Sequence, residues 1–182
     1  EQTPLTTFKL AELINEIFPE GVVNVVYGIG ETVGSRLVNH SDIGMISLTG
    51  DIATGAEILK SASNGVKRTH LELGGKAPVI VFDDANIKEV VEGIRAFGYF
   101  NAGQDCTAAC RIYANQKIYD NLVSDLTSAV STIELNNEDD EKNEIGPLIT
   151  KDHLNRVKGF VDNAKSLKHI EITTGGDPID SK

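Results

Sequence analysis

The stretch "IGMISLTGDIATGAEILKSAS", residues 43–63, decides the fold. Its first part is short and apolar and ends at Gly50, which is typical of a buried strand. Its second part, residues 52–63, repeats apolar side chains at helical spacing. A strand that turns at a glycine directly into a helix is the repeating unit of a parallel, doubly wound sheet. The stretch therefore predicts an α/β fold.

The same alternation continues on both sides of this stretch. Thr3 and Pro4 favour the start of a helix, because proline is tolerated in the first turn. Segment 69–76, "THLELGGK", is interpreted as a bridge, so we expect two α/β domains covering residues 1–71 and 72–182. The other elements predicted are helices at 5–18, 32–40, 86–103 and 118–133, and strands at 22–28, 77–82, 110–114 and 169–174.

Composition excludes several classes of protein. The net charge of −10 argues against a surface that binds nucleic acid or an anionic membrane, since both require clustered Lys and Arg. The longest apolar runs are too short to span a bilayer, and no signal peptide is visible. Two cysteines make no disulfide scaffold, so we expect a reducing, cytoplasmic setting. The acidic run at 136–144, "NNEDDEKNE", is interpreted as a solvated loop and not as a metal site.

Both ends of the chain resemble cut ends. The sequence opens on "EQTPLTT" without an initiator Met and closes just after the strand-like "HIEITT". We therefore expect a fragment of a longer protein.

Cys106 is the first candidate for chemistry. It lies between a predicted helix and a predicted strand, at a connection where backbone N–H groups can point at a reacting oxygen. A thiolate there could attack a carbonyl group, although a lone cysteine is more often an inert core residue. Cys110 is interpreted as a core residue. No third or fourth Cys or His lies nearby, so we predict no metal site.

Glu72 is the second candidate. It stands between Leu71 and Leu73, just before two glycines. Partial desolvation in this apolar setting would raise the pKa of the carboxyl and suit it to general-base work. An exposed surface glutamate is the alternative. None of the four histidines lies in a segment that pairs obviously with Cys106, which weakens a Cys/His hydrolase interpretation.

These two residues occur in motifs that resemble a known family. "LELGGK" at 71–76, with Cys106 in "GQDC" 34 positions after Glu72, strongly resembles the aldehyde dehydrogenase superfamily. The flanking "APVIVFDDANI" resembles it too, as do "EQTPL", "GVVNVVYGIG", "SLTGDIATG" and "EIGPLI". The resemblance covers essentially the whole chain, and paired motifs at this spacing are highly specific.

The resemblance implies a catalytic scheme. Cys106 would be the nucleophile that adds to an aldehyde, hydride would pass to NAD, and Glu72 would activate the water that hydrolyses the resulting thioester. The backbone N–H of Cys106 would form half of the oxyanion hole. Residues 1–71 would be the C-terminal part of the NAD-binding domain, and residues 72–182 the N-terminal part of the catalytic domain. A homotetramer is implied for the whole protein.

The resemblance also implies a nucleotide site. "SLTGDIATG" corresponds to the strand, turn and helix beside the cofactor pyrophosphate, where a helix N-terminus favours anions. Asp51 departs from the family, which commonly has Ser there. Its carboxylate either caps the helix and points away from the phosphate or weakens NAD binding. Glu1 matches a glutamate that holds the adenosine ribose, which favours NAD over NADP. The cofactor-binding residues expected are Glu1, Gly50, Asp51, Ile52, Ala53, Thr54, Gly55 and Leu73.

Segments 67–87 and 90–114 look most like bacterial γ-aminobutyraldehyde dehydrogenases, which act in putrescine degradation. Asp105 could attract the ammonium group of such a substrate, or it could simply hydrogen-bond the local backbone. A betaine-aldehyde or other ω-aminoaldehyde dehydrogenase is the alternative. A catalytically impaired binding or scaffold chain is a further one, and we expect the isolated 182-residue chain to be inactive.

Overall fold

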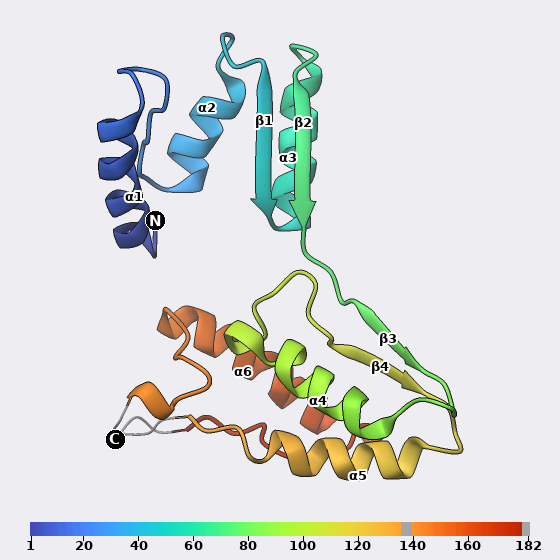
Figure 1. The fold of residues 1–182 in the computed structure, drawn as a ribbon. Helices are drawn as coiled ribbons and strands as arrows, with labels where there is room; N and C mark the ends of the chain where they lie inside the picture. Colours follow the sequence, from blue (N-terminus) through green and yellow to red (C-terminus); the bar gives the residue numbers. More distant parts are fainter. Residues whose placement is uncertain (136–139, 180–182) are drawn as a thin grey trace. The chain divides into compact units, whose positions relative to one another are not determined.

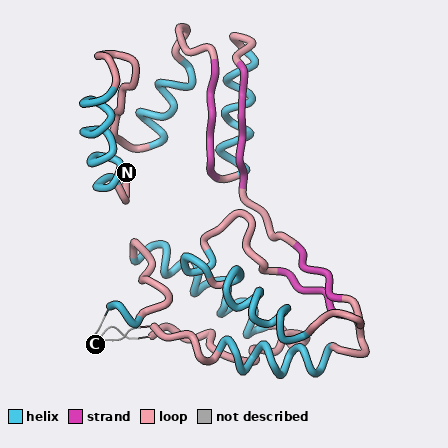
Figure 2. Tube along the Cα trace, in the orientation of Figure 1, coloured by secondary structure: helices cyan, strands magenta, loops and turns pink. Residues whose placement is uncertain are grey.

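The computed structural model describes residues 1–135 and 140–179. The chain divides into two compact units, Glu1–Gly74 and Gly75–Lys182, and each contains two parallel strands joined by a helix (Figures 1 and 2). The predicted α/β fold with parallel sheets is confirmed. The division follows Gly74, whereas we expected it after residue 71, because a strand continues to Leu73. The segment 69–76 is therefore a bridge only from Gly74 onward.

The first unit is built around β1 (Met45–Gly50), α3 (Ile52–Ser63) and β2 (Arg68–Leu73). The strands pair in parallel, from Met45 opposite Arg68 to Gly50 opposite Leu73. Alternate residues of each strand face α3, which lies against one face of the sheet in Figure 1. The core of this unit consists of Ile46, Ile58 and Ala62, with Val38, Ile43, Leu48 and Leu71 packed around them.

The first unit also contains α1 (Pro4–Ile17) and α2 (Ser35–Asn39), the latter preceded by a π-helical turn at Gly30–Gly34. Thr3 is the N-cap and Pro4 the first helical residue, as predicted. The strand predicted at 22–28 is wrong. This segment has no regular structure and pairs with no strand among the described residues, and Val22 and Val26 are exposed. Apolar, β-branched composition makes a strand only where a partner accepts its hydrogen bonds.

The second unit repeats the strand–helix–strand arrangement with β3 (Pro78–Val81), α4 (Ile87–Gly98) and β4 (Arg111–Ala114). The strands pair in parallel from Pro78 opposite Arg111 to Val81 opposite Ala114. Helix α5 (Tyr119–Val130) packs against α4. The core of this unit contains Val81, Val91, Ile118 and Leu122.

Helix α6 (Lys151–Ser166) follows, with the Thr150 hydroxyl accepting a hydrogen bond from the His153 N–H as its N-cap. The predicted strand at 169–174 is wrong, since that segment has no regular structure. Part of the acidic run, residues 136–139, lies outside the described residues. Glu144 at its end is not simply solvated, because its carboxylate accepts two hydrogen bonds from the Arg95 guanidinium, each 2.8 Å long. Among the described residues, no helix is both long and apolar enough to cross a membrane.

Candidate active site

The turn between β1 and α3 lies at the carboxyl edge of the first sheet. Asp51 is the N-cap of α3, and its Oδ1 accepts a hydrogen bond of 2.7 Å from the Ala53 N–H. This satisfies one of the N–H groups that a helix leaves unpaired in its first turn. The expectation that Asp51 caps the helix is confirmed.

Gly55 brings α3 close to the end of β2. A Cβ at this position would lie 2.9 Å from a methyl carbon of Leu73, so only glycine allows the present approach without a shift of that side chain. Close helix–strand packing at a glycine is one of the features of dinucleotide-binding units, next to a turn that presents helix N–H groups to a phosphate. The residues present therefore fit a nucleotide, with the Asp51 carboxylate as the one departure.

The strand register places most of the predicted residues of the first unit together. Because the strands are parallel, their carboxyl ends lie at one edge, with Glu72 opposite Thr49 and Leu73 opposite Gly50. Glu1 is exposed and precedes α1, outside this strand–helix–strand unit. The residues brought to this edge are Gly50, Asp51, Ile52, Ala53, Thr54, Gly55, Glu72 and Leu73.

Glu72 lies on the face of β2 that points away from α3. Its side chain is 60% exposed in this unit. The partial desolvation that its apolar sequence neighbours suggested is therefore not observed here. The reason is the alternation of a strand: Leu71 and Leu73 point to the α3 side, and Glu72 points to the other. Sequence reasoning missed its neighbour His70, whose Nε2 lies 3.5 Å from Glu72 Oε1.

In the second unit, the chain takes an unusual path from α4 to Cys106. The predicted helix at 86–103 ends at Gly98 and gives way to a short helical turn, Phe100–Gly103. Three successive residues there have left-handed φ values: Asn101 at 51°, Ala102 at 58° and Gly103 at 74°. Only glycine adopts this region freely, so Ala102 is strained. The sequence contains no signal for this turn beyond "NAG".

Side-chain hydrogen bonds hold the left-handed turn. Asn101 Nδ2 donates to the Gln104 carbonyl at 3.1 Å, and Gln104 Nε2 donates to the Asn101 carbonyl at 3.2 Å. Each amide thus satisfies a backbone carbonyl of the other residue. The turn is fixed immediately before the candidate nucleophile.

Cys106 is exposed, and its neighbours form a compact turn. Asp105 Oδ1 accepts hydrogen bonds from the Thr107 N–H at 2.8 Å and from the Thr107 hydroxyl at 2.9 Å. These two bonds, with a smaller contribution from the Cys106 thiol, lower the pKa of the Asp105 carboxyl against a small opposing effect of burial. The interpretation of Asp105 as a residue that binds the local backbone is confirmed, and a substrate role stays a prediction.

The segment after Cys106 is anchored in the unit. Ala108 is buried, and the Ala109 carbonyl oxygen lies so close to α4 that a Cβ on Gly98 would approach it to 2.9 Å. Cys110 is half-buried, and its thiol donates to the Ala77 carbonyl at 3.8 Å. The two cysteines therefore have different environments, one exposed at a turn and one held against the start of β3.

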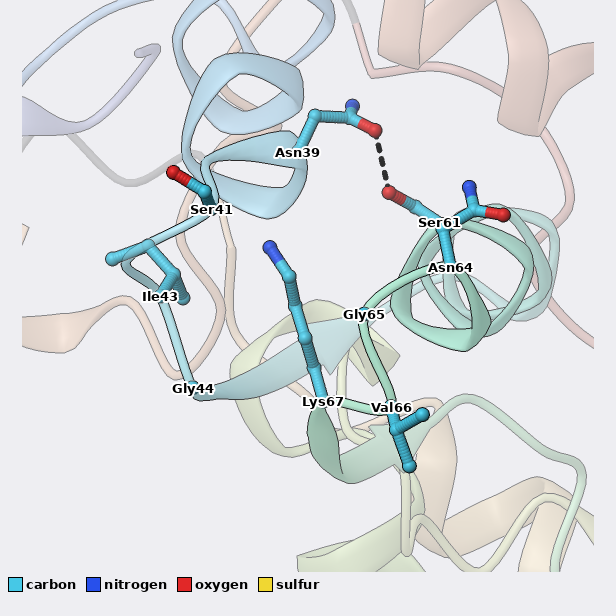
Figure 3. A pocket seen from close by; sticks show the side chains of 9 residues that line it. All are labelled: Asn39, Ser41, Ile43, Gly44, Ser61, Asn64, Gly65, Val66 and Lys67. Carbon is cyan, nitrogen blue, oxygen red and sulfur yellow. Dashed lines mark hydrogen bonds between the residues drawn. The ribbon is translucent and has the colours of Figure 1, made fainter.

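A polar cavity of about 450 Å³ lies elsewhere in the first unit, between the C-terminal ends of α2 and α3 (Figure 3). Lys67 Nζ points into it and donates to the Val38 and His40 carbonyls at 2.7 and 2.5 Å. The ammonium group thus caps carbonyls at the end of α2, where a positive charge is favourable. No predicted site residue lines this cavity.

Among residues 1–135 and 140–179, no cluster of three or more His, Cys, Asp or Glu side chains could hold a metal ion.

Comparison with known proteins gives the family. The model of the "Aldehyde dehydrogenase family" matches residues 1–182. The mitochondrial aldehyde dehydrogenase of Leishmania tarentolae is 38% identical over the whole of this chain, which spans 37% of that protein.

Solved structures agree with this result. Betaine aldehyde dehydrogenase of Staphylococcus aureus in complex with NAD⁺ is 40% identical, with a TM-score of 0.91 over 99% of this chain and 36% of that one. An NAD⁺ complex of an aldehyde dehydrogenase from Bacillus cereus is 33% identical, with a TM-score of 0.92 over 98% of this chain and 37% of that one. The chain thus spans little more than a third of the relatives that it matches, and it belongs to the aldehyde dehydrogenase family.

Proposed function

We propose that the whole protein, meaning the polypeptide that carries these 182 residues, oxidises an aminoaldehyde to the carboxylic acid with NAD as the oxidant. The observation that carries this proposal is the exposed Cys106, three residues after the strained, left-handed residues 101–103 and next to Asp105, whose carboxylate holds the Thr107 N–H. Strained backbone persists where the surroundings hold it, and such places are frequently sites of chemistry. The family and the NAD⁺ complexes of the similar structures support the same reaction.

Cys106 is the proposed nucleophile. Its thiolate adds to the carbonyl carbon of the aldehyde and forms a thiohemiacetal, and the Cys106 backbone N–H stabilises the negative oxygen. NAD, when bound, supplies the acceptor for the hydride that leaves this carbon. The carbon then stays bound to the cysteine as a thioester.

Glu72 is the proposed general base. It takes a proton from a water molecule, whose oxygen attacks the thioester carbonyl. The carbon–sulfur bond breaks, the carboxylic acid departs, and the Cys106 thiolate is restored. The exposure of Glu72 in its own unit fits this role, since water reaches the carboxylate directly.

The proposed NAD site is the carboxyl edge of the first sheet. The first turn of α3 presents N–H groups to the pyrophosphate, and Gly55 lets α3 pack close to Leu73. Asp51 Oδ1 is engaged by the Ala53 N–H, which fixes its carboxylate at the cap. The residues proposed to contact NAD are Glu1, Gly50, Asp51, Ile52, Ala53, Thr54, Gly55 and Leu73.

γ-Aminobutyraldehyde is the proposed substrate, which would place the enzyme in putrescine degradation. Its ammonium group would be attracted by the Asp105 carboxylate, which carries a negative charge at neutral pH and whose pKa the Thr107 hydrogen bonds lower further. Betaine aldehyde is the second candidate, because it also carries a positive nitrogen and because similar solved structures are betaine aldehyde dehydrogenases.

The test is NADH formation by the whole protein with each aldehyde, alongside Cys106→Ala and Asp105→Asn. We expect turnover that prefers γ-aminobutyraldehyde and disappears in Cys106→Ala, with a raised KM in Asp105→Asn. A preference for betaine aldehyde would select the second candidate. Turnover that survives in folded Cys106→Ala would overturn the proposed mechanism.

A homotetramer in the cytoplasm is also proposed for the whole protein. The assembly is suggested by the family resemblance and the location by the two unpaired cysteines. Light scattering on the purified whole protein tests the assembly, and a monomeric mass would contradict it.

A further inference from the structure

Three polar side chains line up on one face of the first sheet. They are Ser47 on β1, and His70 and Glu72 on β2. We propose that His70 is a positioning residue for Glu72, holding its carboxylate for the water-activating step. This inference rests on the proposed role of Glu72 as the base.

The strand geometry places these residues together. His70 and Glu72 are two positions apart on one strand, so both point away from α3. The parallel register sets Ser47 opposite His70. Neighbouring strands are close enough for these side chains to meet, and Ser47 Oγ lies 3.2 Å from His70 Nδ1.

The contacts define an orientation for the imidazole. The Ser47 hydroxyl is able to donate to His70 Nδ1, and this leaves the ring proton on Nε2, the atom that faces Glu72. His70 Nε2 lies 3.5 Å from Glu72 Oε1, which is an ion-pair distance rather than a full hydrogen bond. In this tautomer the Nε2–H points at the carboxylate and attracts it.

The contact with His70 leaves the Glu72 carboxylate open to solvent. The two side chains are 57% and 60% exposed, so water has access to the carboxylate. Arg68 is the other charged residue on this face of β2, and it precedes His70 by two positions. A carboxylate on an open face can take several rotamers, and the contact with His70 favours one of them.

Hydrolysis of the thioester is the step that this contact affects. Formation of the thioester depends on Cys106, which belongs to the second unit, whereas hydrolysis depends on the orientation of Glu72. Loss of His70 should therefore slow deacylation and leave acylation unchanged. A general loss of structure would slow both.

The experiment uses p-nitrophenyl acetate with the whole protein, without NAD. The Cys106 thiolate attacks the acetyl carbonyl, p-nitrophenolate leaves, and an acetyl thioester remains until water hydrolyses it to acetate. The burst of p-nitrophenolate measures acylation, and intact-mass spectrometry follows the decay of the acetyl adduct. For His70→Ala we expect an unchanged burst and an adduct that decays about fivefold more slowly, the size of one exposed ion pair.

The conservative variant His70→Gln distinguishes loss of the contact with Glu72 from a general loss of structure. A glutamine can accept from Ser47 and donate to Glu72, so we expect the rate of adduct decay to recover to within about twofold. His40→Ala is the matched control, since the His40 ring accepts a hydrogen bond from the local Asp42 N–H outside β1 and β2 and should change neither step. Adduct decay as slow in His70→Gln as in His70→Ala would overturn the inference.

A double variant tests whether His70 acts through Glu72. In the Glu72→Gln background, His70→Ala should slow adduct decay no further, because the group that it positions is gone. An additional fivefold loss there, or unchanged decay in His70→Ala alone, would overturn the inference while the proposed function stands. Failure of the unmodified protein to form any adduct on Cys106 would overturn the proposed function itself.

Discussion

The two units contain the same motif with different connections. Helices α3 and α4 each have 12 residues and each joins two parallel strands. In the first unit the return from helix to strand takes only residues 64–67, whereas in the second it takes residues 99–110. The short return contains none of the predicted site residues, and the long one contains Asp105 and Cys106. Extra length after the helix thus provides room for the proposed nucleophile.

The candidate residues of the two units accordingly occupy different places in the motif. In the first unit all of them except Glu1 lie at the carboxyl edge of the strands, where α/β sheets generally bind ligands. In the second unit Cys106 precedes the amino end of β4. Both returns contain left-handed residues, with Val66 in the short one and Asn101, Ala102 and Gly103 in the long one.

Alkylation should show the largest difference within the long return. Cys106 is exposed at its turn, whereas the Cys110 thiol is half-buried and donates to the Ala77 carbonyl. We therefore expect iodoacetamide to modify Cys106 much faster than Cys110, measured by peptide mass spectrometry over time. Equal, slow modification of both would contradict an accessible, activated thiol.

Gly98→Ala should break the anchoring of the long return. The new Cβ would meet the Ala109 carbonyl oxygen at 2.9 Å, and a backbone atom cannot rotate out of the way. We expect a loss of about 1–3 kcal/mol in the free energy of unfolding, together with altered alkylation of Cys106, because the loop must shift. Urea denaturation of the whole protein measures the first effect.

Two glycines provide the comparison for this prediction. Gly93 lies in the same helix with nothing within 4 Å of an added Cβ, so Gly93→Ala should stabilise by about 0.5–1 kcal/mol. At Gly55 the added Cβ meets only the end of the Leu73 side chain, at 2.9 Å, which can rotate. Gly55→Ala should therefore cost less than Gly98→Ala, and the reverse order would show that our account of the long return is wrong.

Val66→Gly should stabilise the short return. Val66 has a φ of 51°, is 91% exposed and follows the C-terminus of α3, where the Lys67 N–H bonds back to the Ala62 carbonyl. This is the position at which helices usually have glycine. Relief of the left-handed strain of a β-branched residue exceeds the entropy cost of glycine, so we expect a gain of about 0.5–1 kcal/mol.

The control for Val66→Gly is Val26→Gly. Val26 is also exposed, at 63%, but it has no left-handed φ, so glycine there should reduce the stability of the whole protein. A loss in both variants, measured by urea midpoint, would show that Val66 is not strained.

The sequence predicted the motif in each unit because apolar spacing and glycine positions are local signals. The helix predicted at residues 52–63 has these bounds in the structure, and capping was one of the two roles that the sequence left open for Asp51. The strands predicted at 22–28 and 169–174 failed because pairing depends on a distant partner that composition does not reveal.

Only part of the candidate site could be predicted, because the sequence signals are local. Cys106 and Glu72 stood out through their motifs, yet the contact between His70 and Glu72 depends on which face of β2 is open. His70 and Glu72 stand two positions apart on β2, and this spacing alone places them on one face of the strand. The left-handed turn before Cys106 is fixed by Asn101 and Gln104 bonding each other's carbonyls, which no local pattern indicates.

The smallest effect concerns acid stability of the second unit. The Arg95 guanidinium binds the Glu144 carboxylate through two hydrogen bonds and lowers the pKa of that carboxyl from its ordinary value of 4.5. A carboxyl whose pKa is lower in the folded state stabilises the protein above its unfolded pKa. That stabilisation is lost as the pH falls through the folded pKa, where Arg95 is still protonated.

Glu144→Gln should therefore flatten the dependence of stability on pH below about pH 4.5 and lower stability slightly near neutrality. Urea midpoints of the whole protein across this range provide the measurement. Glu92→Gln is the matched control, because it removes the same charge from α4, where Glu92 lies 3.9 Å from Lys88. If Glu92→Gln flattened the profile as much as Glu144→Gln, the effect would come from net charge and not from the bidentate contact, since it is Glu144 that accepts the two hydrogen bonds from the Arg95 guanidinium.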